Sequence, residues 1–150
     1  MSEPSTVSGS CLCGTVCFEA TLPPVRFQYC HCISCRKATS SAHGAMIFFL
    51  PENFRWQAGE ELIERYTDEK TNPGYMRWFC RKCGSAVPRL NRTGQFMAVP
   101  AGTLDGDPLA RPERSIYWDE RAPWYVGLDS RPKLAEGLDS AVREEPRSQE

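Results

Sequence analysis

Seven of the eight cysteines in this chain fall into three short clusters whose spacing suits the binding of metal ions. The first cluster holds Cys11 and Cys13, the second holds Cys30, Cys32 and Cys35, and the third holds Cys80 and Cys83. A glycine follows the first and third clusters, and it allows each turn to curl with backbone N–H groups directed at the sulfurs. Seven thiolates complete one tetrahedral site and leave a second site one ligand short.

The complete site is expected to combine Cys11 and Cys13 with Cys80 and Cys83. The two pairs lie far apart in the sequence, so a shared ion would tie the first strand to a late hairpin. Zinc is the common cellular metal that best fits four thiolates, because it is redox-inert and favours tetrahedral sulfur. The alternative is that these thiols are redox-active or incidental. We expect this site to be structural.

Cys30, Cys32 and Cys35 are predicted to face a second ion from a single tight turn. Three protein ligands with one exchangeable position are the usual arrangement of a catalytic zinc. The alternative is a closed site with a fourth protein ligand. For that role His31 is expected to point away, which leaves His43 and Cys17 as candidates. We expect the open arrangement.

Three thiolates also indicate which chemistry to expect. They donate so much charge that zinc becomes a weak Lewis acid, which suits the activation of water poorly. A site of this kind is better matched to another sulfur, which would be held as a thiolate and could attack, or leave from, a carbonyl carbon. The sequence contains no GxSxG elbow, phosphate-binding loop or dinucleotide fingerprint that would indicate another chemistry.

The composition is that of an ordinary globular domain, with 150 residues, 41% of them hydrophobic and 25% charged. Eighteen basic residues balance nineteen acidic ones, so we expect no nucleic-acid partner. The N-terminal sequence lacks the features of a signal peptide, and no apolar run is long enough to span a membrane. We therefore expect a cytoplasmic protein without a membrane partner, in which reduced thiols bind metal.

The pattern of apolar residues predicts a mostly β chain with short helical turns. The strands are expected over residues 14–20, 26–30, 45–50, 62–67, 75–80 and 115–118, with a hairpin over 86–99 and a helical turn over 36–41. We expect a flexible N-terminal tail over residues 1–8, a zinc-binding domain over 9–129, and a polar, mobile tail over 130–150. The core is small, so metal binding should supply part of the folding free energy.

Five segments resemble the glutathione-dependent formaldehyde-activating enzyme family, which shares its domain with centromere protein V. They are residues 9–14, 29–37, 79–85, 101–105 and 122–124. The resemblance implies a β-tent of packed antiparallel sheets, with a structural zinc on Cys11, Cys13, Cys80 and Cys83 and a catalytic zinc on Cys30, Cys32 and Cys35.

The resemblance also implies an activity, a carbon–sulfur lyase reaction that joins glutathione to formaldehyde as S-hydroxymethylglutathione. Its partners are then a small thiol and an aldehyde. Arg36 and Lys37 could hold a carboxylate of that thiol, or could simply form a solvated turn. Relatives often carry histidine where this chain has Ser115 and lysine where it has Arg121, so a potential acid–base group is absent here. The alternative function is a non-enzymatic, zinc-stabilised binding module.

Overall fold

The computed structural model describes residues 3–71, 74–126 and 131–143, and it confirms the prediction of a mostly β chain. The strands are β1 (Thr6–Ser10), β2 (Cys17–Thr21), β3 (Arg26–Cys30), β4 (Gly44–Phe49), β5 (Phe54–Ala58), β6 (Ile63–Asp68), β7 (Tyr75–Cys80), β8 (Arg89–Leu90), β9 (Met97–Pro100), β10 (Arg114–Ile116), β11 (Lys133–Leu134) and β12 (Val142–Arg143). The helix α1 spans Ile33–Thr39, and the 3₁₀ turns are η1 (Pro51–Asn53), η2 (Glu60–Leu62), η3 (Ala101–Thr103) and η4 (Trp118–Glu120). No described helix is long and apolar enough to cross a membrane.

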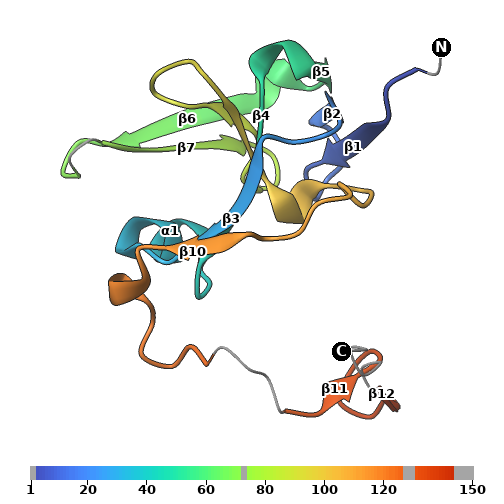
Figure 1. The fold of residues 1–150 in the computed structure, drawn as a ribbon, viewed down its shortest axis with the longest axis vertical. Helices are drawn as coiled ribbons and strands as arrows, with labels where there is room; N and C mark the ends of the chain where they lie inside the picture. The colour runs from blue at the N-terminus through green and yellow to red at the C-terminus, as the bar shows by residue number, and fades with distance from the viewer. Residues whose placement is uncertain (1–2, 72–73, 127–130, 144–150) are drawn as a thin grey trace.

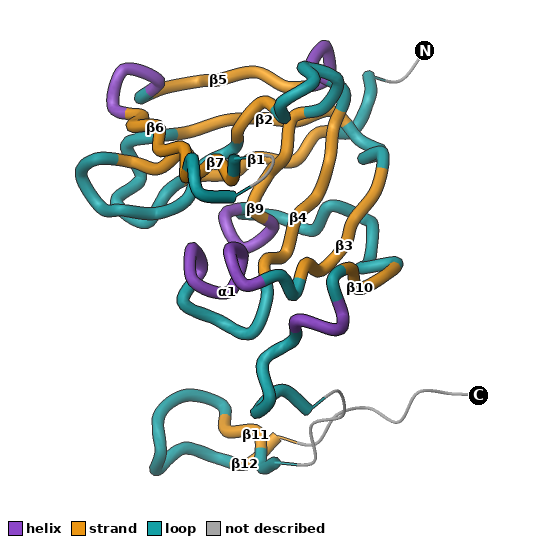
Figure 2. Tube along the Cα trace, turned by 90° about the vertical axis from the view of Figure 1, so that its left-hand side faces the viewer, coloured by secondary structure: helices purple, strands orange, loops and turns teal. Residues whose placement is uncertain are grey.

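Several small sheets make up the fold. One has five strands in the order β10-β3-β4-β9-β8, a second has three in the order β1-β2-β5, and β6 pairs with β7. The neighbouring strands run antiparallel except for β10, which runs parallel to β3, a pairing that the expected antiparallel arrangement did not include. Figure 1 shows the β6–β7 hairpin extending to one side, and Figure 2 shows α1 beside the ends of the central strands.

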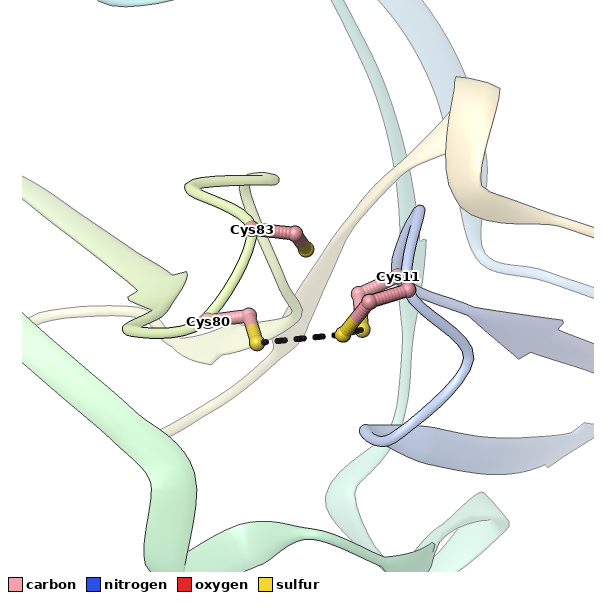
Figure 3. Close-up of side chains that lie close together, drawn as sticks. Cys11, Cys80 and Cys83 are labelled. Atoms are coloured by element: carbon pink, nitrogen blue, oxygen red, sulfur yellow. Dashed lines mark hydrogen bonds between the residues drawn. The ribbon is translucent and has the colours of Figure 1, made fainter.

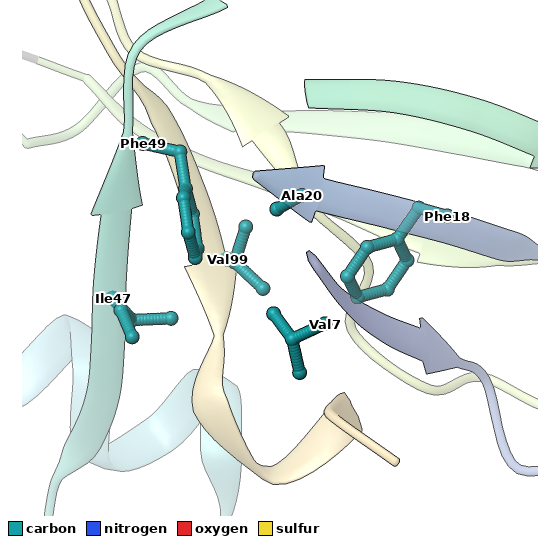
Figure 4. Packing of buried hydrophobic residues seen from close by; sticks show 6 residues of the cluster. All are labelled: Val7, Phe18, Ala20, Ile47, Phe49 and Val99. Atoms are coloured by element: carbon teal, nitrogen blue, oxygen red, sulfur yellow. The ribbon is translucent and has the colours of Figure 1, made fainter. Parts of the chain in front are cut away.

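The core lies between the three-stranded and the five-stranded sheets. Alternate residues of the strands point inward, and the buried cluster consists of Val7, Phe18, Ala20, Ile47, Phe49 and Val99 (Figure 4). Each larger side chain of this kind stabilises the fold by roughly 1.5–3 kcal/mol through burial. The sheets therefore hold each other in place, and the loops at their ends carry the cysteines.

Residues 6–8, which were expected to belong to a flexible tail over 1–8, lie in a strand, and residues 1–2 lie outside the described residues. Strand β1 begins at Thr6 and pairs with β2 along its whole length, from Thr6 opposite Thr21 to Ser10 opposite Cys17. Val7 is only 4% exposed and belongs to the core. The strand was not predicted because Val7 is its one apolar side chain. The alternation of buried and exposed residues is therefore not visible as an alternation of apolar and polar residues.

The polar tail predicted over residues 130–150 contains two short paired strands in its described part. Leu134 of β11 lies opposite Val142 of β12. Residue 130 and residues 144–150, which were included in the expected mobile tail, lie outside the described residues.

We expect Gly9→Ala to destabilise the protein by about 2 kcal/mol, because a Cβ atom at this position would overlap the Phe18 ring. Gly9 lies directly opposite Phe18 in the β1–β2 pair, so neither residue can shift without disturbing the core. Urea unfolding of the zinc-loaded protein would measure the change. Gly102→Ala is the control, because no heavy atom lies within 4 Å of its Cβ position, and it should change stability by less than about 0.5 kcal/mol. Equal stability of the two variants would contradict the expected overlap.

Candidate metal centres

The first group of cysteines comes from two turns that are far apart in the sequence and close together in the fold. One turn follows β1 and the other follows β7, and Figure 3 shows Cys11, Cys80 and Cys83 directed at a common space. The four sulfurs of Cys11, Cys13, Cys80 and Cys83 all lie within 4.8 Å of one another. Cys11 Sγ is 3.5 Å from Cys13 Sγ, and Cys13 Sγ is 3.9 Å from Cys80 Sγ. Sulfurs held about 2.3 Å from a tetrahedral zinc lie about 3.8 Å apart, so this arrangement fits the ion.

The two turns have the same backbone construction. Gly14 has a φ of 77° and donates its N–H to the Cys11 carbonyl, while Gly84 has a φ of 76° and donates to the Cys80 carbonyl. These left-handed conformations favour glycine, as the sequence suggested. The Val16 N–H also donates to Cys11 Sγ over 3.3 Å. The local sequence therefore forms each half of the site, and the packing of the sheets brings the halves together.

Hydroxyl groups around this group favour the thiolate form. The Thr15 hydroxyl lies 3.2 Å from Cys13 Sγ and lowers the pKa of that thiol. Ser85 Oγ lies 3.3 Å from Cys83 Sγ, and this contact lowers the pKa of Cys83 to about 5. Ser85 Oγ also accepts the Leu12 N–H over 3.0 Å. Ser85 thereby joins the two turns, a role that could not be assigned from the sequence.

The second group lies where β3 meets α1. Cys30 ends β3, Cys32 caps α1 and Cys35 lies in its first turn, and the three sulfurs are within 4.8 Å of one another. The Cys35 N–H donates to Cys32 Sγ over 3.2 Å, as an N-cap side chain usually accepts from the first turn. The helix therefore begins at Ile33 rather than at residue 36, where the helical turn was expected. The earlier start was not predicted, because cysteine is not a typical capping residue.

These three thiols are crowded and mostly buried. Cys30 is 7% exposed and Cys35 is 9% exposed, whereas Cys32 is half-buried. Hydrogen bonding from the Cys35 thiol lowers the pKa of Cys30 to about 6, and the same contact raises the pKa of Cys35. Burial raises the pKa of Cys32. Only a cation can favour three thiolates in so small a space, which is consistent with a metal ion such as zinc.

None of the candidate fourth ligands joins this group among the described residues. His31 is fully buried, with its Nε2 3.2 Å from Ser115 Oγ. The His43 ring stacks on Tyr29 at 4.1 Å, and its Nδ1 lies 3.2 Å from the Gly44 carbonyl. Cys17 donates its thiol to the Gly14 carbonyl, beside the first group. In the described part of the chain, the group therefore contains three candidate ligands.

Ser115 lies against His31 because β10 runs parallel to β3. The His31 N–H donates to the Ile116 carbonyl, and the His31 ring meets Trp118 and Tyr125 at 5.0 and 5.1 Å. Burial is the main cause that lowers the pKa of His31, with smaller contributions from His43 and Arg121. The residue at position 115 therefore contacts the buried ring between two candidate ligands, rather than the sulfurs themselves.

A pocket of about 560 Å³ lies over the three sulfurs of the second group. Besides the cysteines it is lined by Ile33, Ser34, Thr71, Tyr75, Tyr117 and Glu120. Tyr75, Tyr117 and Glu120 could not be predicted from the sequence. They come from β7 and from the η4 turn with the residue before it, and they meet α1 only in the folded chain. Arg36, considered as a carboxylate ligand, donates instead to the Glu120 carbonyl over 2.8 Å. That contact holds the η4 turn against α1.

Comparisons with known proteins found a matching family model and a similar solved structure. The family model described as glutathione-dependent formaldehyde-activating enzyme matches residues 6–120, which include both groups of cysteines and Glu120. No curated protein matches the sequence. The crystal structure of a Rhodobacter sphaeroides protein is similar, with a TM-score of 0.55 and 22% sequence identity. The match covers 72% of this chain and 98% of that chain, and it shows a shared fold.

Proposed function

This chain belongs to the glutathione-dependent formaldehyde-activating enzyme family, and from that premise we propose that it is a zinc-dependent carbon–sulfur lyase. Its reaction would be the formation or breakdown of an adduct between a small thiol, such as glutathione, and an aldehyde. The observation that carries the proposal is the group of three cysteines beneath a pocket of about 560 Å³, with no fourth ligand among the described residues.

Three thiolates suit zinc, so Cys30, Cys32 and Cys35 would hold the catalytic ion and Cys11, Cys13, Cys80 and Cys83 a structural one. When bound beneath the pocket, zinc would supply a positive charge and an exchangeable position that favour a thiolate at neutral pH. The backbone N–H of Cys35 keeps Cys32 Sγ directed toward its two partners. The cysteine turn thereby fixes where the incoming sulfur lies.

In the forward direction the thiol sulfur forms a bond to the carbonyl carbon, the C=O π pair moves to oxygen, and the thiol proton ends on that oxygen. Glu120 and Tyr75 are ionisable residues of the pocket lining with the chemistry that this transfer needs. The half-buried Glu120 carboxylate accepts the proton of the thiol and passes it to the carbonyl oxygen once the C–S bond has formed. Burial raises the pKa of Tyr75, so its phenol keeps its proton and donates a hydrogen bond to that oxygen.

The proposal predicts a rate of adduct formation above the uncatalysed rate when zinc-loaded protein is mixed with glutathione and an aldehyde. The measurement would follow the loss of the carbonyl absorbance over a panel of aldehydes. Removal of metal by a chelator should return the rate to background, and added zinc should restore it. No catalysed rate with any aldehyde of the panel, for a protein that retains its zinc, would refute the proposal.

A further inference from the structure

A second pocket, of about 260 Å³, adjoins the one above the cysteines. It lies between α1, β4 and β7, and most of its lining is carbon, including Met46, Met76, Trp78, Val87 and Pro100. Cys35 and Tyr75 line both pockets, so the second begins beside one of the candidate metal ligands. An apolar cavity of about 150 Å³ is enough to hold benzene. This pocket is therefore large enough for a chain of several carbon atoms.

Arg89 brings a positive charge to the wall of this apolar pocket. Its side chain is half-buried and forms no ion pair or hydrogen bond with the residues that the structure describes. The other arginine of the lining, Arg77, already donates to the Gly84 carbonyl over 3.3 Å. A partly desolvated guanidinium without a partner is matched by an anion, and a carboxylate fits its planar donors best.

We propose that this pocket binds the chain of the carbonyl substrate, and that the substrate is an oxo acid whose carboxylate pairs with Arg89. The inference rests on the proposed function, because it assigns the aldehyde of that same reaction. Formaldehyde has no chain and would leave the pocket unfilled. The carboxylate stays charged and unreacted while the thiol adds to the carbonyl carbon beside Cys35.

The thiol is a less suitable occupant for the same pocket. Glutathione carries carboxylates too, but its peptide amides would lose their hydrogen bonds to water against a lining of carbon. A hydrocarbon chain has no such groups. Arg89 at one wall and Cys35 at another thus suit a molecule with a polar group at each end and carbon between them.

The first test measures binding to the zinc-loaded protein by titration calorimetry, with hexanoate and 1-hexanol as probes of equal chain length. Hexanoate is expected to bind at least tenfold more tightly than hexanol. Arg89→Met should remove this difference by weakening hexanoate binding alone, and Arg89→Lys should restore part of it. Arg111→Met is the matched control, since Arg111 is exposed and paired with Asp107, and it should change neither affinity. Equal binding of the two probes, or no effect of Arg89→Met, would overturn the proposal.

The second test identifies the source of the carboxylate by kinetics. With glutathione as the thiol, Arg89→Met should raise KM for 6-oxohexanoate at least tenfold and leave KM for hexanal and glutathione unchanged. A raised KM for glutathione instead would assign the pocket to the thiol and overturn the proposal.

The two tests also separate this inference from the function that it rests on. Carboxylate-selective binding without turnover of any aldehyde would refute the lyase function, and with it the assignment of the occupant as substrate, while supporting the anion site. Turnover of hexanal and formaldehyde, combined with equal binding of hexanoate and hexanol, would support the lyase function and overturn the oxo-acid assignment.

Discussion

Replacing Cys80 by serine is expected to leave most of the chain unfolded under conditions in which the unchanged protein is folded. Cys80 is fully buried and packs in a second core cluster with Cys11, Val16 and Val87. Its sulfur belongs to the group that ties the turn after β1 to the turn after β7, and Cys13 and Cys80 are 67 positions apart in the sequence. An ion shared by both turns would close this long loop in the native state.

The expected size of the effect follows from the energy of metal binding. Structural zinc sites supply about 10–16 kcal/mol of binding free energy, whereas whole domains are stable by only about 5–15 kcal/mol. Loss of one of four thiolates removes a large share of the metal term and also places a hydroxyl in an apolar site. Circular dichroism during thermal unfolding, together with the zinc content of the purified protein, would measure the loss.

Cys17→Ser is the matched control for this experiment. Cys17 is the one cysteine outside the two groups, and its thiol donates to the Gly14 carbonyl over 3.2 Å, a hydrogen bond that a serine hydroxyl can also form. This variant should keep its zinc and its melting temperature. If Cys80→Ser behaves like Cys17→Ser, the first group does not hold a structural ion.

The spacing of the cysteines was enough to predict both groups, because each turn that carries them is local. Residues 30–35 form one short segment from the end of β3 into α1, and the glycines after Cys13 and Cys83 adopt the left-handed conformation that the spacing suggested. The combination of residues 11–13 with 80–83 is a long-range contact. It was predicted from the number of ligands, since four thiolates complete a zinc site. In the structure, the packing of the sheets brings the two turns together.

Strands were predicted well where the apolar alternation is strong. The strands expected over residues 26–30 and 75–80 coincide with β3 and β7. β1 was not predicted because Val7 is the one apolar side chain on its buried face. The parallel pairing of β10 with β3 was not predicted because it depends on contacts between residues about 85 positions apart. The same limit applies to the pocket, where Tyr75 and Glu120 reach the cysteines through the assembly of the sheets rather than through any local motif.

Cys32→Ser is expected to abolish activity while leaving the fold and one zinc ion in place. Cys32 is half-buried and faces the larger pocket, so its substitution removes one of three ligands without opening a cavity in the core. Serine is a good N-cap residue, and its hydroxyl can accept the Cys35 N–H that Cys32 Sγ now accepts, so α1 should still begin at Ile33. The four cysteines of the first group are unchanged, and we expect them to supply most of the metal-dependent stability.

The measurements are the zinc content, the melting temperature and the rate of adduct formation on the same preparation. Zinc should fall from two ions per chain to one, the melting temperature should change by only a few degrees, and the rate should fall at least 100-fold, to the uncatalysed level. Ser34→Ala is the control, because Ser34 lines the same pocket but offers no thiolate, and it should keep two ions and most of the rate. A Cys32→Ser protein with two ions and full activity would place the chemistry elsewhere. Loss of both ions would show that the two centres depend on each other, and it would contradict a separate structural role for the first group.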